Sequence, residues 1–166
     1  MANKQSFTPE EWTKILESTM LAGMAVSAAE PSGLWGSLKE AFASSSALAE
    51  AKLDSGSNEL VKAVVADFET PEGRKAVQDG LRTLLAGAKP ADAVQRSLAN
   101  LREVSAILAA KAPGDAPAFK AWLTGISRKV AEASSEGGLL GFGGVQVSDA
   151  EKATLGDIAK ALGTSA

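Results

Sequence analysis

Hydrophobic residues recur along most of this chain at the three- and four-residue spacing of an α-helix. In the first such segment, Trp12, Ile15, Leu16, Met20 and Met24 fall on one helical face. Similar stripes follow in residues 32–52, 58–68, 71–86, 90–111, 116–130 and 149–162. The pattern predicts about seven helices and no strand.

Several of these helices begin at recognisable capping residues. Thr8 with Glu11, and Ser148 with Glu151, have the spacing of a capping box, in which each side chain binds the other residue's backbone N–H. Asp115 precedes the helix over 116–130 and is expected to be its N-cap. The helix starts are therefore predicted from local sequence as well as from the hydrophobic stripes.

The connections between the predicted helices are short, which favours antiparallel neighbours. We therefore expect residues 1–166 to form one all-α domain, a single compact bundle of about seven short antiparallel helices. Of all residues, 45% are hydrophobic but only 5% are aromatic, a composition that suits closely packed, alanine-rich helices.

Charge and hydropathy narrow the choice of partners. The net charge is −3, and lysine and arginine are scattered, so nucleic acid is not an expected partner. No segment approaches the roughly 18 apolar residues of a membrane span. The N-terminal segment lacks the apolar core of a signal peptide, and the expected location is the cytoplasm.

The chain contains no histidine, cysteine or tyrosine. Ser-His-Asp and Cys-His catalysis are excluded, and the commonest metal ligands are missing. Met20 and Met24 lie one turn apart, but two thioethers alone are a poor copper site, and core packing explains them better. We predict no enzyme, no metal site and no cofactor.

The most unusual local feature is a glycine-rich segment, residues 137–144, which contains Leu139, Leu140 and Phe142. Three interpretations are open: a structural loop that buries these side chains, a loop that docks a protein partner, and a phosphate cradle. The phosphate interpretation is the weakest, because no strand precedes the segment and it lacks the Lys-Ser/Thr ending of a P-loop.

Trp35, which stands between Gly33 and Gly36, is the second candidate. Its ring either anchors the loop by burial, which is the simpler interpretation, or lines a pocket together with Trp12 or Trp122. If the chain has a contact surface for a partner, we predict it at Leu139, Leu140 and Phe142 together with Trp35. The alternative that these side chains are simply buried stays open.

The C-terminal residues resemble the end of TerB-like domains, the tellurite-resistance family of all-helical bacterial proteins. The matching positions are Val147, Ser148, Glu151, Leu155, Ile158 and Leu162. The family's acidic turn is replaced here by Gly143 and Gly144, and residues 29–33 replace the acidic loop of its first hairpin. The resemblance implies an all-α, bacterial, cytoplasmic protein. It transfers no site, and any metal binding that depends on those acids is expected to be lost.

Together these observations predict a non-enzymatic helical-bundle protein that acts through protein–protein contact, with a partner or as a homodimer, or in a stress-associated role. The alternative is a carrier that holds an apolar small molecule or a lipid between its helices. Small residues in 22–29 and 41–49 would border such a cavity, but they would equally let helices pack closely.

Overall fold

The computed structural model describes residues 1–29, 58–136 and 147–164, with side chains in the last helical turn before residue 137 left aside. These residues form a 3-10 helix, η1 (Lys4–Ser6), and six α-helices, with no strand among them. The α-helices are α1 (Pro9–Ala29), α4 (Glu59–Glu69), α5 (Pro71–Leu84), α6 (Pro90–Lys111), α7 (Ala116–Glu136) and α8 (Asp149–Leu162).

The all-α prediction is confirmed, with two corrections. The described residues hold six α-helices, one fewer than predicted, and the helix expected over 32–52 lies outside them. Nor are the helices uniformly short, because α1 and α7 have 21 residues each and α6 has 22. Helices of this length expose enough apolar surface along one side to pack against several neighbours.

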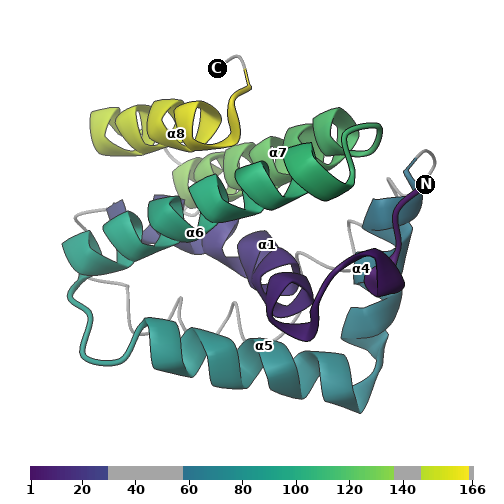
Figure 1. The fold of residues 1–166 in the computed structure, drawn as a ribbon. Helices are drawn as coiled ribbons and strands as arrows, with labels where there is room; N and C mark the ends of the chain where they lie inside the picture. The colour runs from purple at the N-terminus through teal and green to yellow at the C-terminus, as the bar shows by residue number, and fades with distance from the viewer. Residues whose placement is uncertain (30–57, 137–146, 165–166) are drawn as a thin grey trace.

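Helix α1 lies in the middle of the bundle and contacts each of the other five described α-helices. In Figure 1, α5 lies below α1, α6 and α7 lie above it, and α8 is at the top. The most extensive packing is between α1 and α6, followed by α1 and α7. The core is therefore arranged around one helix.

The apolar stripe predicted for α1 is buried as expected, but burial extends beyond that stripe. Every residue from Ile15 to Ala28 is buried, on all sides of the helix. Burial is tolerated because the run from residue 18 to 29 contains no charged residue. Its hydroxyls are satisfied locally: Ser18 Oγ donates to the Ile15 carbonyl at 2.6 Å. Hydrogen-bonded hydroxyls of this kind are much less costly to bury than unpaired ones.

Both predicted capping boxes are confirmed. Glu11 N–H donates to Thr8 Oγ1 at 3.2 Å and Thr8 N–H donates to Glu11 Oε2 at 2.8 Å. The same reciprocal pair joins Ser148 and Glu151. Each side-chain oxygen satisfies an N–H that the helix itself leaves without a partner.

Asp115 directly precedes α7 as predicted, and its backbone carbonyl accepts a hydrogen bond from the Phe119 N–H at 3.1 Å, but its carboxylate does not bind the first turn of the helix. Its carboxylate instead accepts hydrogen bonds from the Ala2 backbone N–H at 2.7 Å and from Asn58 Nδ2 at 3.1 Å. Asp115 is buried, and these bonds tie the N-terminal segment and the start of α4 to the start of α7. A long-range partner has replaced the local one that its position suggested.

Candidate functional site

The four residues predicted to contact a partner lie outside the described residues. Leu139, Leu140 and Phe142 fall between the end of α7 and the start of α8, and Trp35 falls between α1 and α4. Their assignment therefore stays a prediction. Helices α7 and α8, which flank this segment in the sequence, contact each other.

The small-residue stretch at the end of α1 packs closely against another helix. Ala22 and Ala25 are fully buried. Ser127 Oγ, on α7, donates a hydrogen bond to the Ala22 carbonyl at 3.1 Å, so a side chain of one helix reaches the backbone of the other. Of the two interpretations of residues 22–29, these contacts favour close helix packing. Residues 41–49 lie outside the described residues.

The two tryptophans considered as pocket partners of Trp35 are both packed by neighbours. Trp12 is 3% exposed, and its ring centroid lies 5.8 Å from that of Phe7, just before the start of α1. Trp122 packs against Phe119 with ring centroids 5.3 Å apart. Met20 and Met24 are buried in the core, which confirms the packing interpretation for that pair.

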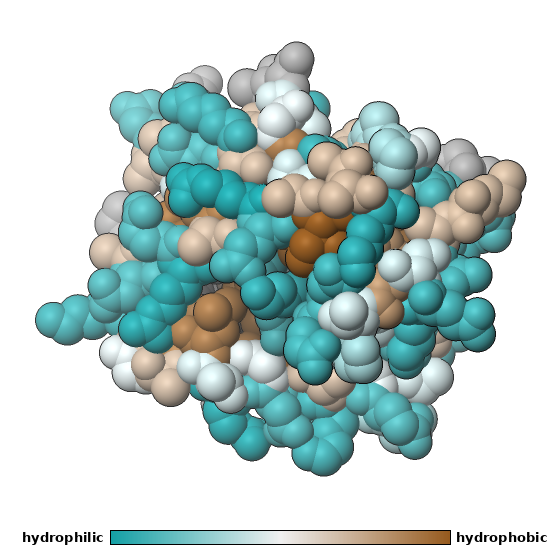
Figure 2. Space-filling view, viewed as in Figure 1, coloured by the Kyte–Doolittle hydropathy of each residue, from teal (hydrophilic) through white to brown (hydrophobic). Residues whose placement is uncertain are grey.

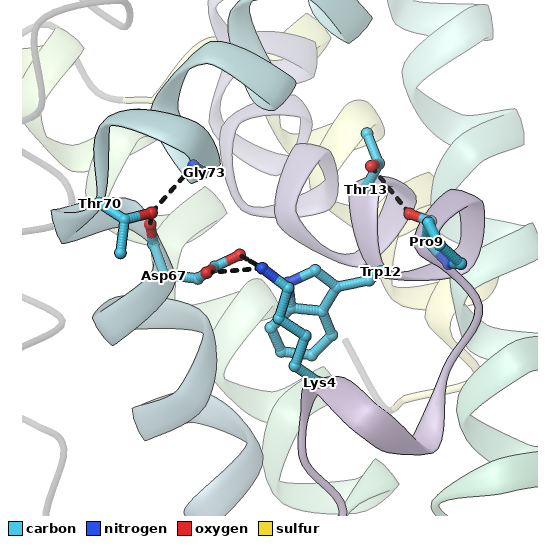
Figure 3. A network of polar contacts seen from close by, with 7 residues as sticks. All are labelled: Lys4, Pro9, Trp12, Thr13, Asp67, Thr70 and Gly73. Carbon is cyan, nitrogen blue, oxygen red and sulfur yellow. Dashed lines mark hydrogen bonds and ion pairs between the residues drawn. The ribbon is translucent and has the colours of Figure 1, made fainter.

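Trp12 also belongs to a polar network that joins η1, α1 and α4 (Figure 3). Its Nε1–H donates to Asp67 Oδ2 at 2.7 Å, and Lys4 Nζ binds both oxygens of the same carboxylate at 2.9 and 3.0 Å. Thr70 Oγ1 donates to the Asp67 backbone carbonyl at 2.7 Å. Every polar atom in this contact has a partner, so the network holds the fold together and offers little to a ligand.

A different arrangement occurs between α1 and α5, where the surface is hollowed by about 450 Å³. The described residues that line this open hollow come from both helices: Thr13, Glu17, Ala76, Asp79, Gly80, Thr83 and Leu84. The hollow is shallow and open to solvent, unlike the enclosed clefts that bury most of a small ligand. It is the candidate site that the described residues offer.

Glu17 is the central residue of this hollow. The residue is only 7% exposed, and among the described residues its carboxyl is hydrogen-bonded by Asn100 on α6, whose Nδ2 donates to Oε2 at 3.3 Å. Burial raises the pKa of Glu17, while the charge of Lys14 and the Asn100 bond lower it in part. Asn100 Oδ1 is itself buried without a hydrogen-bond partner. This buried pair is therefore incompletely satisfied.

Gly80 allows α5 to approach that carboxyl group. A Cβ atom placed on Gly80 would lie 1.7 Å from Glu17 Oε1, well inside the contact distance. Glycine at this position leaves room for the Glu17 carboxyl where it lies, and any larger residue would oblige that side chain to move. The position of the carboxyl depends on this one missing methyl group.

Asp79 supplies a second carboxylate at the rim of the hollow. Its side chain is 49% exposed, and it pairs with Lys75 and, at 3.6 Å, with Arg82 on the same helix. Hydrogen bonding to Lys75 holds the pKa of Asp79 below its ordinary value, so this group is ionised at neutral pH. The hollow therefore combines one exposed carboxylate with one buried carboxyl.

None of these residues was singled out from the sequence, although one signal was present. Glu17 is the last charged residue before an uncharged run of twelve, residues 18–29. A helix that is apolar on all sides is a buried helix, so a charge at its edge is expected to be partly buried as well. Its proximity to Gly80 and Asn100, in contrast, has no local signal.

The fold and this hollow define the class of protein only as an all-α bundle around a central helix. No family model, curated protein or solved structure matches the chain. The TerB-like resemblance therefore remains a prediction. In the part of the chain that the structure describes, no helix has the length and apolar character to cross a membrane. Within the same residues no three acidic side chains gather as a metal site would require.

Proposed function

We propose that this chain is a non-enzymatic helical-bundle protein of the bacterial cytoplasm, which acts through contact with a protein partner or a second copy of itself, or has a stress-associated role. The proposed contact residues are Leu139, Leu140, Phe142 and Trp35. The absence of histidine, cysteine and tyrosine from the chain supports a role without catalysis.

The observation that carries the proposal is the distribution of apolar side chains on the surface. Among the described residues, Met1 is the single exposed large hydrophobic residue. The face in Figure 2 is mainly hydrophilic, and hydrophobic residues are visible chiefly in recesses between polar side chains. Protein interfaces usually have an apolar centre. The larger hydrophobic residues that reach the described surface, such as Trp122 and Leu155, are partly buried against the core, and the proposed contact rests on the apolar character of Leu139, Leu140, Phe142 and Trp35 in the sequence.

The test replaces the apolar character of the glycine-rich segment and measures partner capture. A double variant, Leu140→Ser with Phe142→Ser, should lose a partner cross-linked in bacterial cells and keep the melting temperature of the parent protein. A matched control, Leu140→Met with Phe142→Leu, keeps the segment apolar and should retain the partner. If the serine variant unfolds while the control does not, these side chains belong to the core and the proposed contact is wrong.

The carrier of an apolar small molecule or lipid is the alternative. The hollow between α1 and α5 supports small-molecule binding, whereas Ala22 in the small-residue stretch lies directly against Ser127 of α7. Native mass spectrometry of the protein purified from bacterial cells tests it directly. A retained mass that is lost on denaturation would favour a carrier, and the absence of saturable binding of an apolar dye would argue against it.

A further inference from the structure

The hollow between α1 and α5 presents hydrogen-bond acceptors in excess of donors. Thr13 Oγ1 donates its hydrogen to the Pro9 carbonyl, and Thr83 Oγ1 donates to the Asp79 carbonyl, each at 2.9 Å. Both hydroxyls therefore keep only lone pairs for a ligand. The remaining polar groups in the described lining are the carboxyl groups of Glu17 and Asp79. A ligand that fits this lining must donate hydrogen bonds.

Glu17 also lacks a cation of its own. Its Oε2 accepts from Asn100, and its Oε1 has no hydrogen-bond or ion-pair partner among the described residues. Lys14 lies one turn away on α1 but pairs with Glu103 on α6. An ionised carboxyl on a largely buried residue gains more from a counter-ion than one on a fully exposed residue does, because water screens the interaction less.

The shape of the free acceptors distinguishes between organic cations. A guanidinium group binds best to both oxygens of one carboxylate, and Asn100 already occupies one oxygen of Glu17. An ammonium group is a compact charge with three donors that point in different directions. Acceptors on α1 and α5, on two sides of one hollow, suit that geometry.

We propose that the hollow binds the ammonium group of a small primary alkylamine, with Glu17 as its counter-ion. Thr13, Thr83 and Asp79 accept its remaining hydrogen bonds at the rim. Ala76 and Leu84, the apolar residues of the lining, contact its alkyl chain. This site is independent of the protein contact proposed above, and it takes a cationic ligand where the carrier alternative takes an apolar one.

The raised pKa of Glu17 is consistent with a site that lacks its cation. Protonation removes the counter-ion, so a bound ammonium group competes with the proton for the carboxyl. The charged groups that face Glu17 are Lys14 on its own helix and Asp79 on α5, while α6 contributes the neutral Asn100. Binding should therefore strengthen as the pH is raised from 5 to 8.

The test is a titration of the full-length protein with n-butylammonium chloride at constant ionic strength and pH 8, followed by NMR of the backbone amides and methyl groups. The expected result is a saturable shift centred on Thr83, Leu84 and Ala76. Butyrate and n-butanol, which have the same chain without the positive charge, should bind at least tenfold more weakly.

Variants then test the counter-ion. Glu17→Gln keeps the size of the side chain and should weaken butylammonium binding at least tenfold. Glu72→Gln makes the same change at an exposed position of α5 outside the hollow and should bind as the parent does. Thr83→Val, at an exposed helical position, should weaken butylammonium binding severalfold. This variant replaces Glu17→Gln as the test of the site if Glu17→Gln fails to fold.

Three results would overturn the proposal. One is the absence of a saturable shift in the parent protein. The second is equal binding of butylammonium and butanol, which would show an apolar site instead. The third is undiminished binding by folded Glu17→Gln or, if that variant is unfolded, by Thr83→Val.

Discussion

The candidate site depends on the fit of the Glu17 carboxyl against Gly80, and replacing that glycine tests the fit directly. In Gly80→Ala, the new methyl group would lie 1.7 Å from Glu17 Oε1 and 2.8 Å from its Cδ. The α5 backbone needs no change, because alanine is the best helix former. The Glu17 side chain must therefore move away from Gly80, and it can turn toward the open hollow only by leaving its present contact with Asn100.

Two opposing contributions determine the expected change in the free energy of unfolding on Gly80→Ala. Alanine in place of glycine inside a helix stabilises by about 1 kcal/mol. Displacing the carboxyl breaks the 3.3 Å bond from Asn100, whose other polar atom already has no partner. Leaving such a buried group unpaired costs about 1–3 kcal/mol. We expect Gly80→Ala to destabilise the parent protein by about 1 kcal/mol, taking the middle of these ranges.

The effect of Gly80→Ala on the free energy of unfolding should change from destabilising to stabilising when Glu17 is first replaced by alanine. In that background the opposing carboxyl is absent and the Asn100 bond is already lost, so only the helix term of about 1 kcal/mol remains. The coupling between the two positions is then about 2 kcal/mol, within the range for residues in contact. Gly125→Ala is the matched control, because a Cβ there meets nothing within 4 Å. It should stabilise both backgrounds by about 1 kcal/mol.

The assay is urea unfolding of the six proteins, followed by circular dichroism at a helix wavelength and linear extrapolation to water. The reasoning would be refuted if Gly80→Ala stabilised the parent protein and the Glu17→Ala variant by the same amount. That result would mean that the carboxyl does not rest against Gly80.

Three further predictions test other contacts. In Gly73→Ala the new Cβ would lie 2.1 Å from the Asp67 carbonyl, a backbone atom that cannot turn aside, so the free energy of unfolding should fall by about 2 kcal/mol; an unchanged urea midpoint would contradict this. Trp12→Phe removes the indole donor to Asp67 and should cost about 1–3 kcal/mol in urea unfolding, whereas a cost below about 0.5 kcal/mol would show that this bond is dispensable. The pKa of Glu17 is raised in the folded state, so the unfolded chain loses its proton first as the pH rises, and folding is disfavoured progressively above the ordinary pKa. Glu17→Gln lacks this loss, and its stability relative to the parent should increase between pH 4 and pH 8; thermal melts that stay parallel across that range would exclude a raised pKa.

Much of the helical framework could be predicted because its signals are local. Thr8 and Ser148 meet their partners three residues along the chain, in Glu11 and Glu151, and both pairs form as expected. A cap needs only the backbone N–H groups of the next turn, which are present in any helix that begins there. Asp115 shows the limit of this logic, because its carboxylate binds Ala2 and Asn58 from distant parts of the chain.

The candidate site could not be predicted in the same way. Sequence reasoning placed the contact residues at Trp35, Leu139, Leu140 and Phe142, which lie outside the described residues. The hollow at Glu17 depends on a glycine 63 positions away on α5 and an asparagine 83 positions away on α6. No periodicity links residues so far apart.

Local sequence predicts the fold class, the start of each described helix, and the chemistries that a chain without histidine, cysteine and tyrosine lacks. The end of α7 was not predicted, because the helix continues to Glu136 where the sequence indicated an end near residue 130. The predicted features follow from propensity, capping and composition, which act over one or two helical turns. Only the tertiary structure decided that α1 is buried on every side and that its one buried carboxyl meets Gly80 and Asn100. The physical reason is that burial and partner choice depend on which helices pack together, a long-range result that stripes on single helices leave open.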